Sequence, residues 1–165
     1  PPDISVISVR KVIPSANARF SALTRTYSYY ISKSKDPFNT ETSWFMNVTP
    51  DMGKMNQAAK ILPGYTDFTS FSRLHSDVKT NICRIYEAEW TEDENRMVFT
   101  IKADRFLRNM VRAIVGTLVK TGFHKIEIPD FTRIIESRNR GNAGPSAPAK
   151  GLFLEDIEYP DGIFL

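Results

Sequence analysis

Three arginines fall close together in the segment Ala103–Leu118, and their spacing could place guanidinium groups beside a functional site. The segment has the apolar periodicity of an amphipathic helix, which predicts Arg105, Arg108 and Arg112 on its polar side. Arg112 falls where the polar and apolar sides meet, so its guanidinium could hold a carboxylate or phosphate through two hydrogen bonds in a partly dry environment. The alternative is a solvent-exposed polar face, which position alone favours because charged stripes on helices usually face water.

A second candidate lies in Thr26–Ser32, a run of β-forming residues. Alternation along a strand would place Arg25, Tyr27 and Tyr29 on one face. Aromatic rings stack on unpaired bases while arginine binds phosphate, so this trio is typical of RNA recognition. The alternative packs both tyrosines into the core and leaves Arg25 at the rim, and the pattern alone favours this alternative.

Other kinds of catalytic site find little support in the sequence. One cysteine, Cys83, and two histidines, His75 and His124, match no metal-ligand spacing, so we expect no metal site. There is no phosphate-binding Walker loop, dinucleotide fingerprint or nucleophile elbow. The segment Asp67–Phe71 places a carboxylate and two hydroxyls among aromatic rings, but a turn fixed by Asp67 explains it equally well.

Composition limits the class of protein and the environment. With 165 residues and 41% apolar content, the chain can bury a core, and we expect one domain over residues 1–165. The net charge is only +3, but Lys102–Lys125 holds six basic residues and one acidic residue, which indicates a polyanion bound on one face. The single cysteine and the lack of a long apolar run predict a cytoplasmic protein without membrane contact.

The elements that must position these residues follow from the hydrophobic pattern. Their order predicts an α+β fold, a ferredoxin-like antiparallel sheet with helices on one face. The long irregular segments between them (33–42, 65–81 and 139–150) are of a length that is more often functional than idle. The predicted strands are Ile4–Ile13, Thr26–Ser32, Cys83–Thr91, Arg96–Ala103 and Gly151–Ile157; the predicted helices run from a Thr49 N-cap to Leu62, from Ala103 to a Gly122 C-cap, and over Asp130–Ser137.

Taken together, these segments resemble the bacterial tRNA pseudouridine synthase A family. Five motifs similar to those of the family occur in the family's order and span nearly the whole chain. Their patterns are His-Ala-Arg-Phe-x-Ala, Arg-x-Tyr-x-Tyr, Asp-Phe-x-Ser-Phe, Phe-Leu-x-x-Met-Val-Arg-x-Ile-Val-Gly and Ala-Pro-Ala-x-Gly-Leu. The matching segments here are Asn17–Ala22, Arg25–Ile31, Asp67–Phe71, Phe106–Gly116 and Gly144–Leu154.

The resemblance implies the pseudouridine synthase fold and isomerisation of uridine to pseudouridine at positions 38 to 40 of the tRNA anticodon stem-loop, without a cofactor. The target nucleotide would be flipped out of its stack. Tyr27 would stack on the uracil, Arg112 would pair with a nucleophilic aspartate, and Leu152 would form an apolar wall. Arg25, Arg105 and Arg108 would contact RNA. Members of the family work as homodimers, which we expect of the full-length protein.

Two departures from the family's pattern bear on activity. The family's nucleophile lies in an Arg-Thr-Asp-x-Gly-Val-His motif that this chain does not contain, and neither Asp67 nor Asp104 occupies such a motif. We therefore expect this chain to be the C-terminal half of a synthase and to be inactive alone. Asn17 replaces the family histidine. The alternatives are a non-catalytic ferredoxin-like RNA-binding module and, third, a protein-interaction domain that uses the sheet.

Overall fold

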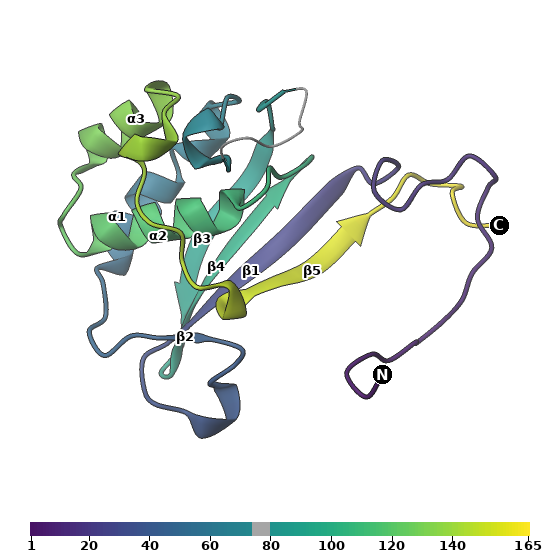
Figure 1. The fold of residues 1–165 in the computed structure, drawn as a ribbon, viewed down its shortest axis with the longest axis horizontal. Helices are drawn as coiled ribbons and strands as arrows, with labels where there is room; N and C mark the ends of the chain where they lie inside the picture. Colours follow the sequence, from purple (N-terminus) through teal and green to yellow (C-terminus); the bar gives the residue numbers. More distant parts are fainter. Residues whose placement is uncertain (74–79) are drawn as a thin grey trace.

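The structure, a computed structural model of the chain, describes residues 1–73 and 80–165. It is a mixed α+β fold in which these residues form a five-stranded sheet and three α-helices (Figure 1). The α+β class predicted from the sequence is therefore confirmed. In chain order the elements are β1 (Thr24–Ser32), β2 (Trp44–Phe45), α1 (Met52–Ala59), β3 (Ile85–Glu92), β4 (Arg96–Ala103), α2 (Met110–Gly122), α3 (Ile128–Glu136) and β5 (Leu152–Glu158).

β1 organises the sheet because it pairs with three other strands. β4 runs antiparallel along one of its edges and β3 continues the sheet beyond β4, while β5 runs antiparallel along the other edge. β2 shares that second edge but is parallel to β1, with Ile31 opposite Trp44 and Ser32 opposite Phe45. The prediction of a wholly antiparallel sheet is therefore wrong at β2. The segment 33–43 carries the chain back alongside β1 before β2 begins, as a parallel pair requires.

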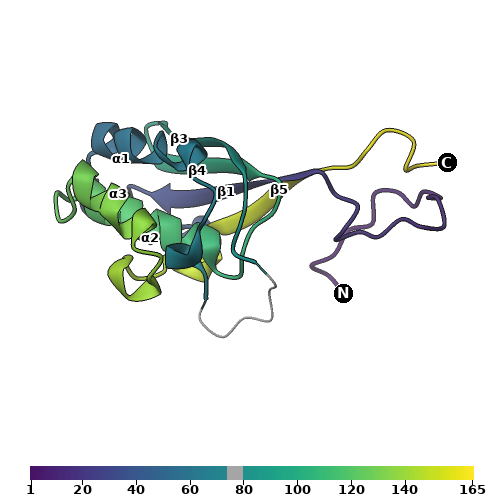
Figure 2. The same cartoon turned by 90° about the horizontal axis from the view of Figure 1, so that it is seen from above.

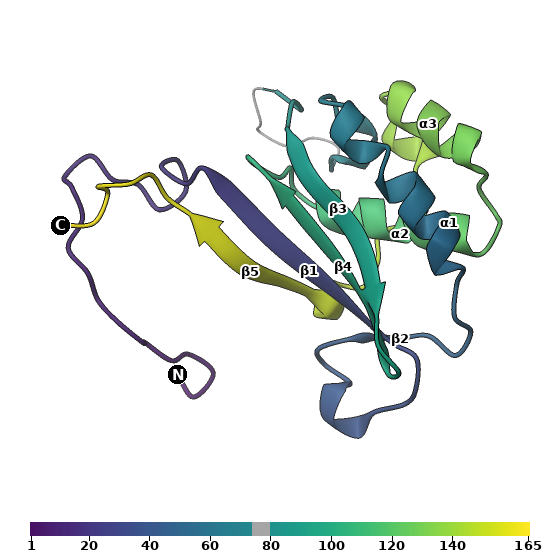
Figure 3. The ribbon, with the colours of Figure 1, turned by 180° about the vertical axis from the view of Figure 1, so that it is seen from behind.

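The three helices lie against one face of the sheet, as views from its two sides show (Figures 1 and 3). α1 contacts β3 and α2, and α3 contacts both other helices. Among the described residues, no helix has both the length and the apolar character needed to cross a bilayer. The core between the two layers is rich in aromatic rings, whose burial is a large part of the driving force for folding; its largest aromatic members are Trp90, Tyr29, Phe68, Phe71, Phe99 and Phe131.

The start of α2 differs from the sequence prediction. The segment Asp104–Asn109 is irregular, and the helix begins only at Met110. Asn109 has φ 68° and ψ 2°, a left-handed conformation that interrupts a right-handed helix. α2 is also buried on most sides, so it is a core helix and not the amphipathic surface helix that we predicted. Of the three arginines, only Arg112 lies on it.

The predicted strand Ile4–Ile13 is also wrong. Its apolar side chains are exposed, with Ile7 at 96% and Val9 at 90%, and its one ladder contact is an isolated bridge between Val12 and Phe164. The N-terminal segment extends away from the sheet beside the C-terminal residues (Figure 2). Alternating apolar residues favour a strand only where a neighbouring strand can pair with them, and no described strand lies beside this segment.

The remaining predicted elements are confirmed, with shifts at their ends. The hairpin β3–β4, the helix α3 and the strand β5 lie where the sequence placed them. α1 is capped by Asp51, whose carboxylate accepts from the backbone N–H of Lys54 at 3.0 Å, so Thr49 is not the N-cap. Gly122 is the last residue of α2 and not its C-cap; Phe123 takes that place.

Candidate functional site

Tyr27 lies on β1 with its ring half-buried against the segment that follows β4. Its ring meets Phe106 edge to face, with the ring centroids 5.1 Å apart. Across the sheet Tyr27 is opposite Ile101 of β4 and Leu154 of β5. The strand alternation predicted for β1 therefore holds, because Tyr29 and Ile31 continue the same face into the buried core. Tyr27 lies on this face at the boundary between the buried core and solvent.

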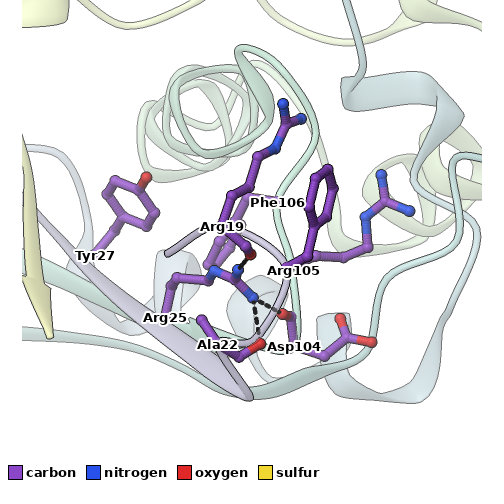
Figure 4. Close-up of a pocket in the computed structure, with 8 residues that line it drawn as sticks. Arg19, Ala22, Arg25, Tyr27, Asp104, Arg105 and Phe106 are labelled. Atoms are coloured by element: carbon purple, nitrogen blue, oxygen red, sulfur yellow. Dashed lines mark hydrogen bonds between the residues drawn. The ribbon is translucent and has the colours of Figure 1, made fainter. Parts of the chain in front are cut away.

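Arg25, two residues earlier on the same face, is held by backbone oxygens. Its guanidinium donates to the carbonyls of Ala22 at 3.0 Å and Asp104 at 2.6 Å, and also to that of Arg19 (Figure 4). These bonds tie the chain before β1 to the end of β4. Three of the five N–H donors of Arg25 thus serve the fold, which leaves two for any ligand.

A cavity of about 480 Å³ opens beside these two residues (Figure 4). Cationic and aromatic side chains dominate its wall, and the one carboxylate in the wall, that of Asp104, accepts from the backbone N–H of Arg84 at 2.8 Å. A cavity of this composition suits a phosphate together with a planar ring. The lining residues are Arg19, Phe20, Ala22, Arg25, Tyr27, Asp104, Arg105 and Phe106.

Arg112 is half-buried near the start of α2 and is paired with the loop before β5. Its Nε donates to the carbonyl of Ala147 at 2.6 Å, and the N–H of Ala147 donates back to the carbonyl of Arg112 at 2.9 Å. The terminal nitrogens of its guanidinium form neither a hydrogen bond nor an ion pair with any residue that the structure describes. A fixed guanidinium with free terminal donors can bind a planar anion in a fork.

Tyr29 links Arg112 to the strand that carries Tyr27. Its hydroxyl donates to the carbonyl of Pro148 at 2.7 Å, next to the carbonyl that holds Arg112. Burial raises the pKa of Tyr29 well above its ordinary value, and the charge of the nearby Arg112 opposes this rise. Leu152 of β5 lies opposite Tyr29 and is partly buried against the core. Tyr29 therefore lies between the loop that holds Arg112 and the strand β5 that carries Leu152, two residues after Tyr27 on β1.

The other two arginines of the predicted helix, Arg105 and Arg108, lie in different environments. Arg105 lines the cavity beside Tyr27, whereas Arg108 is exposed, and its carbonyl accepts from the N–H of Arg73 at 3.1 Å. Sequence reasoning missed Arg19 and Phe106 as members of this site. Phe106 was not predicted as a site residue because the apolar spacing of its segment predicted a helix that packs it into the core.

A family model described as tRNA pseudouridine synthase matches residues 58–160, more than half of the chain. The chain belongs to the tRNA pseudouridine synthase family. Its curated relatives include tRNA pseudouridine synthase A of Bacteroides fragilis, 58% identical over 165 residues that cover 99% of this chain and 66% of the relative. The same protein of Porphyromonas gingivalis is 52% identical over 100% of this chain and 66% of the relative. That of Treponema denticola is 39% identical over 99% and 62%.

The chain spans 62–66% of the length of these relatives. The residues that match the family model, 58–160, include Arg112 and Leu152. They do not include β1, which carries Tyr27. The resemblance to tRNA pseudouridine synthase A drawn from the five motifs is confirmed by the relatives, whose similarity covers β1 as well.

Asp67, which lies within one of the five motifs, has structural partners, as Asp104 does. The Asp67 carboxylate accepts from the N–H and hydroxyl of Thr69 at 3.0 and 2.6 Å and pairs with Arg138 at 3.0 Å, which confirms the turn interpretation. Burial opposes ionisation of Asp67, but these bonds and the Arg138 charge outweigh it and lower its pKa. In the described part of the chain, no cluster of three possible metal ligands occurs; His75 lies outside it.

Proposed function

We propose that this chain carries the uridine-binding part of the active site of a tRNA pseudouridine synthase. The supporting observation is that the loop 147–148 accepts from both Arg112 and Tyr29, while Leu152 lies opposite Tyr29 and Tyr27 precedes Tyr29 by two residues on the same strand face. Tyr27, Arg112 and Leu152 are the residues to which the family resemblance gives catalytic and uracil-binding roles.

The substrate is the anticodon stem-loop of tRNA, with the uridines at positions 38 to 40 as targets. The uridine must leave the stack, because its reacting atoms are unreachable inside a helix. Tyr27 then stacks on the extruded uracil and Leu152 closes one side with an apolar wall. Arg19, Arg25 and Arg105 bind the adjoining phosphates at the cavity, and the exposed Arg108 binds phosphate farther out.

The reaction is an isomerisation that needs no cofactor. An aspartate carboxylate attacks the nucleotide and forms a covalent bond with it, the bond between C1′ and N1 breaks, a new bond forms between C1′ and C5, and the bond to the carboxylate breaks, which restores the aspartate. C5 loses its proton and N1 gains one, so atoms and electrons balance. Tyr27 assists loss of the C5 proton, and the terminal nitrogens of Arg112 hold the aspartate ionised. Asp67 and Asp104 are engaged in the fold, and residues 1–165 lack the family's Arg-Thr-Asp-x-Gly-Val-His motif, so we assign the attacking carboxylate to a segment outside this chain.

Assignments of fold, domain, location and assembly also belong to this proposal. The connectivity β1-α1-β3-β4-α2-β5, with spatial order β5-β1-β4-β3, supports a ferredoxin-like arrangement to which β2 is an addition. It corresponds to the C-terminal subdomain of the pseudouridine synthase fold, a single domain over residues 1–165. The full-length protein acts in the cytoplasm as a homodimer, and residues 1–165 alone do not turn over tRNA.

The test is the release of tritium from tRNA labelled at C5 of uridine, with the longest reading frame that contains this chain and with residues 1–165 alone. We expect release by the longer protein, and a loss of at least about 100-fold in kcat for Arg112→Ala with tRNA binding retained. Wild-type turnover by Arg112→Ala would remove the role given to this residue. Binding of tRNA without any tritium release would instead favour the non-catalytic RNA-binding module.

A further inference from the structure

The loop 144–148 lies directly on the helix α2. A Cβ added to Gly116 would stand 1.8 Å from the carbonyl oxygen of Pro145, so the loop backbone occupies the place of a side chain. The N–H of Gly144 donates to the Thr117 hydroxyl at 2.9 Å, and that hydroxyl donates to the carbonyl of Ala113 at 2.8 Å. The helix and the loop therefore form one packed unit.

Two side chains outside the proposed catalytic set fasten this loop near the start of α2. The amide nitrogen of Asn109 donates to the hydroxyl oxygen of Ser146 at 2.6 Å. The guanidinium of Arg140 donates to the same hydroxyl oxygen at 3.1 Å and to the carbonyl of Gly144 at 3.0 Å. Asn109 does so from a left-handed backbone conformation, with φ 68°, which a residue other than glycine adopts at a cost. Asn109 therefore combines an unfavourable backbone conformation with the hydrogen bond to Ser146.

The carbonyls of this loop in turn accept hydrogen bonds from Arg112 and from Tyr29. The carbonyl of Ala147 accepts from Nε of Arg112 at 2.6 Å, and that of Pro148 accepts from the Tyr29 hydroxyl at 2.7 Å. We propose that Asn109 is a positioning residue: its amide fixes Ser146 and thereby the loop carbonyl that orients the Arg112 guanidinium. The catalytic consequence rests on the function proposed above, whereas the positioning of Arg112 does not.

Replacing Asn109 by glycine distinguishes the effect of the backbone conformation from the effect of the side-chain amide. Asn109→Gly keeps, and relaxes, the left-handed conformation but removes the donor to Ser146. Asn109→Asp tolerates the same conformation and restores the link, because the Ser146 hydroxyl can donate to the carboxylate. The matched control is His124→Gly: His124 also has positive φ, 55°, but follows the other end of α2 and does not contact the loop.

The readout is solvent exchange of the Arg112 side-chain Nε–H in residues 1–165, followed by NMR. We expect exchange about tenfold faster in Asn109→Gly and in Ser146→Ala, near wild-type exchange in Asn109→Asp, and no change in His124→Gly. Unchanged exchange in both Asn109→Gly and Ser146→Ala would overturn the inference. So would equal acceleration in His124→Gly, which would show a general loosening of α2.

A second arm measures pseudouridine formation by the longest reading frame. Asn109→Gly lowers kcat about tenfold with KM for tRNA unchanged, and Asn109→Asp recovers most of that loss. Absence of turnover in the wild-type protein would count against the proposed function alone, because the exchange measurement still decides whether Asn109 orients Arg112. A rise in KM with unchanged kcat would contradict a positioning role and indicate an RNA contact.

Discussion

At Tyr27 the contribution of the ring to packing can be separated from the chemistry of the hydroxyl. The ring edge packs on Phe106, whereas the hydroxyl makes no hydrogen bond to any residue within the described ranges. We therefore expect Tyr27→Phe to change the free energy of unfolding by less than about 0.5 kcal/mol, because no buried partner loses its bond.

The same substitution should lower kcat by at least about 100-fold in the full-length enzyme while tRNA binding persists, since stacking is retained and proton transfer is lost. Thermal unfolding and tritium release from C5-labelled tRNA measure the two effects. Tyr30→Phe is the control, because Tyr30 lies on the opposite face of β1 with its hydroxyl on Glu155. Normal turnover by Tyr27→Phe would limit Tyr27 to stacking.

Asp67 gives a prediction about pH. Its folded-state pKa is lowered, so the unfolded chain takes up its proton at a higher pH than the folded chain does. The stability that Asp67 contributes is thus complete above the unfolded pKa of about 3.9 and is lost as the pH falls through the folded value.

Urea unfolding between about pH 2 and pH 6 should show a shallower acid loss of stability in Asp67→Asn than in the wild type. Asp161→Asn is the control, because Asp161 is exposed and none of the described residues bonds to its carboxylate. An identical acid limb in Asp67→Asn and the wild type would mean that the Thr69 and Arg138 contacts do not hold the carboxylate in solution.

Among the helices and strands, the sequence correctly predicted those whose hydrophobic pattern agrees with the way they pack in the fold. The hairpin β3–β4 and the helix α3 have both the periodicity and the turn or cap signals of their type, and they form where predicted. The errors come from context that periodicity does not contain. Apolar spacing continues through Asp104–Asn109, but the left-handed Asn109 ends the helical path. Ile4–Ile13 alternates like a strand but has no described strand beside it.

The candidate site was predictable to a similar degree. Alternation placed Arg25, Tyr27 and Tyr29 on one face correctly, because side-chain direction in a strand is a local property. The meeting of Arg112 with the loop 147–148 depends on hydrogen bonds to backbone carbonyls far away in the sequence. Such contacts cannot be recognised from the amino-acid sequence. The connection between Tyr29 and Arg112 through this loop is therefore known only from the structure.

The packing of the loop on α2 predicts the cost of a small substitution. Gly116→Ala would drive a methyl group into the Pro145 carbonyl, and because backbone cannot yield as a flexible side chain does, we expect a loss of ~1–3 kcal/mol in unfolding free energy. Gly64→Ala is the matched control, because a Cβ there meets nothing within 4 Å. Chemical denaturation of both variants measures the difference. Equal stability of the two would show that the loop does not rest on Gly116.

For the whole molecule, the arrangement of charge matters more than its small net value of +3. The cavity beside β1 gathers Arg19, Arg25 and Arg105, while α1, whose Lys54 pairs with Glu127, packs against β3 at the edge of the sheet. Neutralised phosphates release counterions, so a contact of this kind is recognised by its dependence on salt. The position of the cavity thus predicts where salt-dependent RNA contacts are made.

We expect residues 1–165 to bind an anticodon stem-loop weakly, with affinity that falls as salt rises. Replacing both Arg19 and Arg105 by Gln should reduce the slope of log affinity against log salt by about 1.4, because each phosphate contact on a single strand contributes about 0.7. Lys54→Gln removes one positive charge that does not line the cavity and should leave the slope unchanged. Fluorescence anisotropy over a salt series measures all three proteins. A slope that Lys54→Gln lowers as much as the double variant does would mean that net charge, and not the cavity, governs binding.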